Sequence, residues 1–359
     1  MNYFYVIFLQ MVYGTLYTQF NDFQKTYNKN YAEDEYVERF NIFMNNVNII
    51  EKHNQSPNRH FWMNINEFSD LTPEEFKEKY IGKTYSDMSS NYGCVLLNYS
   101  VTLDQVQNEQ LHDETVNRES VNNYGDEILN QNFRLIEDTE NFDWRDYNVV
   151  GPVRNQGQCG SCWAFATTAN AESIWAIHTG QLYDLSEQYL VDCATGKEYL
   201  NMGCQGGNMD SAFKYMIQNK QCVEQEYPYV SGVTEHKGKC HSCNEVTRYS
   251  SCYDVESNNQ VALKSAVMLN PVVIGIEADT YYFQSYSSGI IDGPWCGNTI
   301  DHAVEIVGFG VDNGTKYWSV RNSWGEAWGE NGYFRILRTD SVNDPGICGL
   351  AIEPSYIAI

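Results

Sequence analysis

A cysteine at the start of an expected helix is the first residue whose position suggests chemistry. Cys162 ends the segment Gln156-Gly-Gln-Cys-Gly-Ser-Cys and opens a helical pattern over 162–178. Unpaired backbone N–H groups and the helix dipole favour a thiolate at such a position, and the thiolate is the nucleophilic form of cysteine. Cys162 is therefore a candidate nucleophile.

The thiol also needs a base, because the pKa of an unassisted cysteine is roughly 8.5. His302 opens a β-strand pattern that ends in glycine, and Asn322 could hold its imidazole in the useful tautomer. The side chain of Gln156 and the backbone N–H of Cys162 could face a developing oxyanion. Together these residues predict acyl transfer through a covalent thioester.

Two other interpretations of the cysteines compete with this one. Cys159-x-x-Cys162 could be a redox pair, and Cys240-x-x-Cys243 could complete a four-cysteine zinc site with it. The redox interpretation lacks alternating strands and helices, and zinc fits poorly in a secreted chain with further cysteines. We therefore expect no metal and no cofactor.

Four segments in a fixed order strengthen the catalytic interpretation. They read Gln156-Gly-Gln-Cys-Gly-Ser-Cys162-Trp, Gly203-Cys-Gln-Gly-Gly207-Asn-Met-Asp, Asp301-His-Ala and Asn322-Ser-Trp-Gly-x-x-Trp328-Gly-x-x-Gly332-Tyr. Over about 140–359 the chain resembles the papain family of cysteine peptidases, within it the cathepsin L-like branch. The resemblance implies that Cys162 is the nucleophile, His302 the general base and acid, Asn322 its orienting partner and Gln156 an oxyanion donor. A catalytically silent homologue that binds a partner through the cleft is the alternative.

An N-terminal unit precedes this domain. Apolar residues in 34–53 recur at spacings of three and four, which predicts one face of a helix. Thr72 followed by Pro73 predicts the start of a second helix. The intervals Glu35-x3-Arg-x3-Phe-x2-Asn-x3-Ile-x3-Asn54, followed by Asn64-x-Asn-x-Phe-x-Asp70, resemble the inhibitory propeptide of papain-like peptidases, so the chain's own propeptide is an expected partner.

These patterns divide the chain into four parts. We expect a signal peptide at 1–17, an inhibitory helical propeptide domain at 18–80, a linker at 81–135 and a peptidase domain at 136–359. In the last part helical patterns precede β patterns, which favours an α+β fold with two lobes. The resemblance implies a helical lobe, a β-barrel-like lobe and an active-site cleft between them.

Composition limits the partners and the compartment. A net charge of −24 offers no favourable surface for nucleic acid or an anionic membrane. We expect no transmembrane segment, a monomer, and protein and peptide substrates. Passage through the secretory pathway is consistent with a lysosome, a digestive vacuole or the extracellular space.

Eleven cysteines leave an odd number after the implied bridges are formed. The resemblance implies Cys159–Cys204, Cys296–Cys348, and a bond from Cys193 to either Cys240 or Cys243. With Cys162 left as a thiol, Cys222, Cys252 and one of the Cys240/Cys243 pair remain in the peptidase domain. The simpler outcome is that two of these three cysteines form one extra bridge and the third stays a thiol. The sharper hypothesis is that Cys94, in the linker, bonds the odd cysteine.

The resemblance also assigns a pocket for the substrate residue two before the scissile bond. Its implied walls are Met209, Gly275 and Ile300, reached from the Gly206-Gly207 edge, with Glu353 at the floor. Asp301 and Trp324 are further expected substrate-binding residues. Apolar walls favour Leu, Val or Phe, and Gly275 is expected to leave room for a longer side chain. Glu353 could pair with Arg if it points inward rather than into solvent.

Activation is expected to be proteolytic, with cleavage near 131–140. Protonation of carboxylates such as Glu35 and Asp70 is expected to weaken the charge pairs that hold the propeptide.

Overall fold

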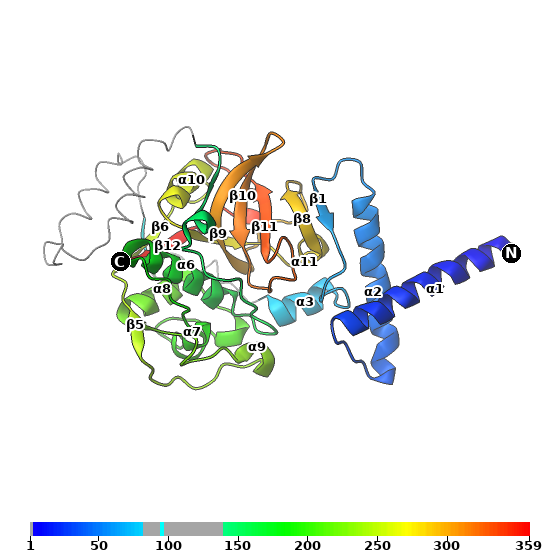
Figure 1. Ribbon diagram of the computed structural model, residues 1–359, viewed down its shortest axis with the longest axis horizontal. Coiled ribbons are helices and arrows are strands. Elements are labelled where there is room, and N and C mark those ends of the chain that lie inside the picture. Colours follow the sequence, from blue (N-terminus) through cyan, green and yellow to red (C-terminus); the bar gives the residue numbers. More distant parts are fainter. Residues whose placement is uncertain (1–2, 82–93, 97–138) are drawn as a thin grey trace, which may run out of the picture.

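The computed structural model describes residues 3–81, 94–96 and 139–359 (Figure 1). Residues 3–17 of the expected signal segment 1–17 lie in a helix that continues to Thr26. Residues 1–2 and most of the expected linker lie outside the described residues. Within the described part of the chain, no helix combines the length and apolar character needed to cross a membrane.

The N-terminal unit, residues 18–81, contains the expected propeptide domain 18–80, is called the prosegment below, and forms three helices and one strand. Its elements are the end of α1 (Tyr3–Thr26), which begins before residue 18, and α2 (Glu33–Asn54), β1 (Phe61–Met63) and α3 (Pro73–Tyr80). The predicted start of α3 is confirmed: Thr72 accepts a hydrogen bond from Glu75 N, and the Glu75 carboxylate accepts one from Thr72 N. Aromatic side chains fill the α1–α2 contact, where Phe20 and Phe43 are fully buried.

The remainder is an α+β domain with a helical lobe and a sheet lobe (Figure 1). Its helices are α6 (Cys162–Thr179), α7 (Glu187–Cys193), α8 (Met209–Gln218), α9 (Ser231–Thr234), α10 (Gln260–Leu269) and α11 (Tyr281–Gln284), with 3-10 turns at Trp144–Tyr147, Gly203–Gln205 and Ile347–Gly349. Helix α6 is buried on nearly every side, because it packs against α7 and α8 on one side and β7, β9 and β12 on the other. Its first residue therefore lies where the two lobes meet.

The sheet lobe is built on long antiparallel strands. The strands are β2 (Val95–Leu96), β3 (Phe142–Asp143), β6 (Ser251–Asp254), β7 (Val272–Ile276), β8 (Tyr286–Ile291), β9 (His302–Asp312), β10 (Thr315–Arg321), β11 (Tyr333–Leu337) and β12 (Ser355–Ala358); β4 (Gln221–Cys222) and β5 (Glu245–Thr247) form a separate pair. The main sheet has the order β1-β8-β11-β10-β9-β7-β12-β6-β2, with β3 also paired to β9. Strands from the chain before residue 136 thus lie at both ends of the sheet, β1 beside β8 and β2 beside β6.

All eleven cysteines lie in the described residues, and ten of them form five disulfides. The bridges are Cys94–Cys252, Cys159–Cys204, Cys193–Cys240, Cys222–Cys243 and Cys296–Cys348. They exclude both the redox pair and the four-cysteine zinc site, because Cys159, Cys240 and Cys243 are bonded elsewhere. Cys94 bonds to Cys252, as expected from the odd number of cysteines left after the implied bridges. Cys162 is the one cysteine outside the bridges.

Candidate active site

Cys162 is the first residue of α6 and is completely buried. The start of a helix carries the positive end of the helix dipole, which favours negative charge on sulfur. The chain therefore carries its one cysteine outside a disulfide where a thiolate is most easily stabilised.

His302 and Asn322 are brought together by the antiparallel pairing of β9 and β10. His302 begins β9, and Asn322 follows the last residue of β10. The imidazole Nε2 lies 2.8 Å from the Asn322 side-chain oxygen Oδ1, so Nε2–H donates and Nδ1 is left as the basic nitrogen. The Trp324 ring stacks on the imidazole at 4.6 Å between centroids, and all three side chains are buried. Water is thereby kept from the Nε2–Oδ1 hydrogen bond.

Burial controls the charge of this histidine. It lowers the pKa of His302 to about 4, against the opposing effect of the hydrogen bond to Asn322. The imidazole is therefore neutral at pH 5 and above while the prosegment covers the site.

The Gln156 side chain is held rigidly beside this group. Its Nε2 donates to the carbonyl of Cys159 at 2.8 Å, and its Oε1 accepts from Ser323 Oγ at 2.7 Å. Ser323 directly follows Asn322, so the same short segment holds both the Gln156 side chain and the His302 side chain. This arrangement presents an amide N–H at a fixed position near the start of α6.

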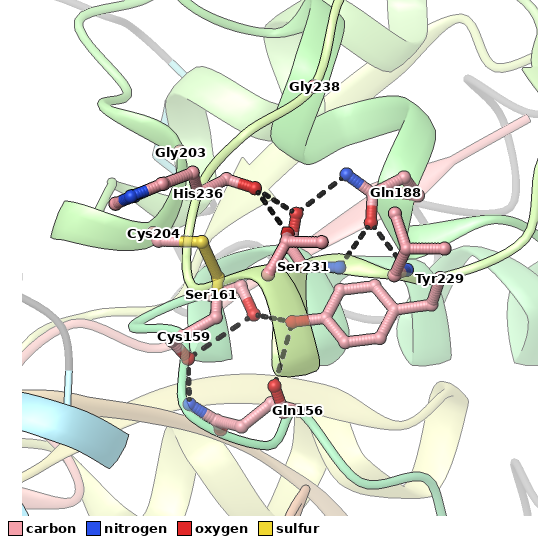
Figure 2. Close-up of a disulfide and its surroundings, with 12 residues drawn as sticks. Gln156, Cys159, Ser161, Gln188, Gly203, Cys204, Tyr229, Ser231, His236 and Gly238 are labelled. Atoms are coloured by element: carbon pink, nitrogen blue, oxygen red, sulfur yellow. Dashed lines mark hydrogen bonds between the residues drawn. A yellow bond between two sulfur atoms is a disulfide. The ribbon is translucent and has the colours of Figure 1, made fainter.

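The loop between Gln156 and Cys162 is fixed from the other side by Tyr229 and the Cys159–Cys204 bridge (Figure 2). The Tyr229 hydroxyl lies 2.8 Å from both the Gln156 carbonyl oxygen and Ser161 Oγ. Gly157 has a φ of +57°, and a Cβ there would lie 2.6 Å from the Gly232 carbonyl oxygen. The loop can follow this course only with glycine at that position.

The prosegment occupies the site directly. The second hydrogen bond from Gln156 Nε2 goes to the carbonyl oxygen of Tyr80, at 2.7 Å, so a prosegment carbonyl lies where an oxyanion donor points. Phe76 packs edge-on against Trp324 at 5.0 Å between centroids. Lys77 pairs with Asp279 and lies 3.6 Å from a carboxylate oxygen of Asp301, the residue before His302. The site is closed by a segment of its own chain.

The residues expected to line the specificity pocket are only partly brought together. Met209 begins α8 and is buried in the same apolar cluster as Ala303, next to His302. Gly207 approaches Trp163 so closely that a Cβ would lie 2.7 Å from the ring, and Gly206 takes a φ of +118° just before it. Asp301 accepts a hydrogen bond from Ala278 N at 2.8 Å. Gly275 lies directly against Ile300, because a Cβ there would collide with the Ile300 methyl group Cγ2. Room for a longer substrate side chain stays a prediction.

Glu353 has acidic neighbours that the sequence did not indicate. Burial, and secondarily the charge of Asp210, raise the pKa of Glu353 to about 7. Burial also raises the pKa of Asp254 to about 7, with Asp210 and Glu353 contributing. A half-buried group of three carboxyls therefore lies beside Met209, which argues against the simple solvent-exposed alternative for Glu353.

Sequence reasoning missed several residues of the site. Tyr229 and Lys77 lie in no recognisable motif. Their roles could not be predicted, because their partners Gln156 and Asp279 lie 73 and 202 residues away in the sequence. Ser323 lies inside the Asn-Ser-Trp run, and its position next to Asn322 was the available signal.

Comparisons with known proteins agree with this geometry. Residues 139–358 match the family model described as papain family cysteine protease, and residues 20–76 match the cathepsin propeptide inhibitor domain (I29). The chain is 39% identical to germination-specific cysteine protease 1 of Arabidopsis thaliana, over 92% of this chain and 79% of that protein. It is 40% identical to thiol protease SEN102 of Hemerocallis sp., over 90% and 81% respectively.

Solved structures of precursors share the whole arrangement. The chain superposes on a recombinant stem bromelain precursor with a TM-score of 0.77 at 34% identity, covering 96% of this chain and 99% of that one. Digestive procathepsin L 3 of the Tenebrio molitor larval midgut gives 0.76 at 32% identity, with the same coverage. A buried thiol at a helix start, a histidine–asparagine pair and a prosegment in the cleft define a cysteine protease precursor. This chain belongs to the papain family of cysteine proteases and carries the family's propeptide inhibitor domain.

Proposed function

We propose that Cys162, His302, Asn322 and Gln156 carry out peptide-bond hydrolysis in this protease. The observation that carries the assignment is the 2.8 Å His302–Asn322 hydrogen bond under the Trp324 ring, with Cys162 at the start of α6. Nδ1 of His302 accepts the thiol proton, and the resulting thiolate and imidazolium stabilise one another and titrate as a pair.

The reaction then proceeds through an acyl-enzyme. The thiolate attacks the peptide carbonyl, and Gln156 Nε2–H with the Cys162 backbone N–H stabilises the oxyanion that forms. The imidazolium protonates the leaving amine as the C–N bond breaks. A water molecule, deprotonated by His302, hydrolyses the thioester and restores the thiol.

Substrate selection would depend on the pocket for the residue two before the scissile bond. We assign its walls to Met209, Gly275 and Ile300, reached from the Gly206-Gly207 edge, with Glu353 at the floor. Asp301 and Trp324 complete the proposed substrate-binding residues. The buried Met209 and Ile300 support a preference for Leu, Val or Phe. The carboxyls around Glu353 support acceptance of Arg once they are charged.

The form and location of the enzyme follow from the same features. We propose that the protein is a monomer that passes through the secretory pathway to a lysosome, a digestive vacuole or the extracellular space. The five disulfides support this route, because such bonds form in an oxidising compartment. Residues 1–17 would be removed as a signal peptide, 18–80 would inhibit, 81–135 would be lost as linker, and 136–359 would be the peptidase.

Active-site titration separates this assignment from a silent binding protein. An irreversible thiol reagent should label processed enzyme once per molecule and abolish peptide hydrolysis in proportion. Cys162→Ala should bind no reagent and leave purified precursor uncleaved at acid pH. Normal maturation of Cys162→Ala without another peptidase would refute self-processing, and hydrolysis without labelling would refute the assignment of Cys162.

A further inference from the structure

A covalent bond joins the segment after the inhibitory prosegment to the peptidase domain. Cys94 and Cys252 form a disulfide between residues 158 positions apart in the sequence. The two residues after Cys94 form strand β2, which pairs in parallel with β6 through Val95–Tyr253 and Leu96–Asp254. Cys94 and Cys252 are 7% and 5% exposed, so this anchor is buried rather than hanging from the surface.

The anchor lies between the inhibitory contacts and the expected processing region. The contact with the oxyanion donor is made by Tyr80, and Cys94 follows it by 14 residues. Cleavage near 131–140 would fall after the anchor. One cut there breaks the peptide chain but leaves the inhibitory part bonded to Cys252 through Cys94.

We propose that the first product of maturation is a disulfide-linked two-chain protein in which the prosegment stays attached and continues to inhibit. Release then requires one of two further events. Either a second peptide bond is cut within 82–93, which leaves a short Cys94-containing chain on the mature enzyme, or a thiol reduces Cys94–Cys252. In the second case two thiol molecules are oxidised to one disulfide, and Cys94 and Cys252 each gain a hydrogen.

Tethering changes how the inhibitor responds to dilution. A short linker holds its ligand at an effective concentration of about 1 mM, whatever the total protein concentration. A free prosegment, in contrast, dissociates when the protein is diluted below its Kd. The first product should therefore remain inactive at any dilution, unlike an enzyme whose prosegment is held by noncovalent contacts alone.

The surroundings of the bridge protect it from reduction. Side-chain oxygens of Asp210 and Asp254 and the sulfur of Cys94 lie within 4.8 Å of one another. Reduction begins with attack by a thiolate anion, which needs access to a sulfur atom and is repelled by nearby carboxylates. Both burial and charge therefore slow loss of the tether, and slow it more when the carboxyls are ionised.

The covalent part of the proposal is tested on protein that cannot process itself. A recognition sequence for a site-specific protease is placed near residue 135 in full-length Cys162→Ala protein, which is then cut once. Without reductant, denaturing electrophoresis should show one band of full mass, and with reductant two. The same protein with Cys94→Ser and Cys252→Ser should give two bands under both conditions, whereas Cys222→Ser with Cys243→Ser, which removes a bridge inside the peptidase domain, should behave like the parent. Separation of the parent chains without reductant would overturn the proposal.

The inhibitory part is tested with Cys162 present, in oxygen-free buffer without added thiol. After one cut at neutral pH the parent and the Cys222/Cys243 variant should stay inactive over a 1,000-fold dilution, whereas the Cys94/Cys252 variant should gain activity as it is diluted. Equal activation of all three would overturn the proposal. Digestion of the prosegment to completion then measures full activity. If no variant is active even then, the catalytic assignment fails, while the electrophoresis result still decides whether the tether exists.

Discussion

At the scale of single residues, the site shows which charges burial controls. His302 and Glu353 were both identified from the sequence, but their ionisation depends on groups that meet only in the fold. Burial moves the pKa of His302 down and that of Glu353 up, because in each case it disfavours the charged form. Both shifts bear on activity between pH 4 and 8.

Glu353 should make the preference for Arg depend on pH near 7. Its carboxyl stays protonated as the pH rises toward its pKa of about 7 and becomes negative above it. The ratio of kcat/KM for an Arg-Arg substrate to that for a Phe-Arg substrate should therefore rise through this range. A charge-assisted hydrogen bond of roughly 1.5–3 kcal/mol corresponds to about 10- to 100-fold.

Glu353→Gln, which keeps the size of the side chain, should flatten this rise without changing cleavage after Phe-Arg. If the variant retains the parent's pH-dependent ratio, Glu353 does not contact the substrate. Glu256→Gln is the matched control, because it makes the same change at an exposed carboxyl outside this group.

The precursor should hold Cys162 as an unreactive thiol. With a His302 pKa of about 4, the imidazole in the covered site is neutral at pH 6 and cannot stabilise a thiolate as a cation. Removal of the prosegment admits solvent and allows the ion pair to form. Alkylation of Cys162 by iodoacetamide at pH 6 should then be at least about 100-fold faster in processed enzyme, since an ordinary thiol is less than about 1% ionised at that pH. Equal rates before and after processing would contradict this account.

At the scale of elements, local patterns predicted the helices and strands well. The apolar spacing over 34–53 corresponds to α2 (Glu33–Asn54), and the Thr72-Pro73 signal corresponds to the capping box that begins α3. Such signals are local, because capping and amphipathic spacing involve residues three or four apart. The placement of α3 over the cleft was not local, since it depends on pairs such as Lys77 with Asp279.

Helix α3 should contribute a pH-sensitive contact through Lys77. Burial raises the pKa of Asp301 to about 8, so this carboxyl gains a proton as the pH falls through that value and its attraction for Lys77 is lost. Lys77→Met removes the pair at all pH values. Since a partly exposed ion pair contributes roughly 1 kcal/mol, we expect precursor processing to be about fivefold faster above pH 8, where Asp301 is charged. The acceleration should shrink as the pH falls below that value and only the pair of Lys77 with Asp279 is left.

Lys79→Met on the same helix is the control, because Lys79 is also exposed and we assign it no role in docking. The rate of loss of full-length protein, followed by electrophoresis at several pH values, measures the effect. An equal acceleration in the two variants would mean that helix charge in general, rather than the Lys77 pair, governs docking.

At the scale of the whole molecule, the sequence predicted the order of parts better than their connections. The four catalytic segments were identifiable because each has its own motif, and their meeting followed from the family resemblance. The partner of Cys94 could be suggested only from parity, and neither β2 beside β6 nor the carboxyls around Glu353 could be predicted. These contacts join residues far apart in the sequence, 158 positions in the case of Cys94 and Cys252, and no local preference specifies them.

The acid response of the prosegment should depend on its own internal charge pairs. Glu35 and Asp70, which we expected to hold it in place, contact prosegment cations rather than the peptidase domain. Arg39 donates to the Glu35 and Glu75 carboxylates, each at 2.8 Å, and to the Asp70 carbonyl at 3.1 Å, so it joins α2 to α3. Loss of these charge pairs therefore weakens the fold of the inhibitor itself.

Arg39→Met should therefore move processing toward neutral pH. Losing these hydrogen bonds costs roughly 1–2 kcal/mol, which for one linked proton is equivalent to about one pH unit in the midpoint of processing. Arg59→Met is the control, because among the described residues Arg59 donates to the nearby Ser56 carbonyl and lies over the Trp62 ring, both within the same loop and strand. The midpoint is measured as the pH at which half of the precursor is converted in a fixed time. A midpoint that stays at the parent's value in Arg39→Met, while Lys77→Met shifts it, would show that acid acts on the docking contacts and not on the fold of the prosegment.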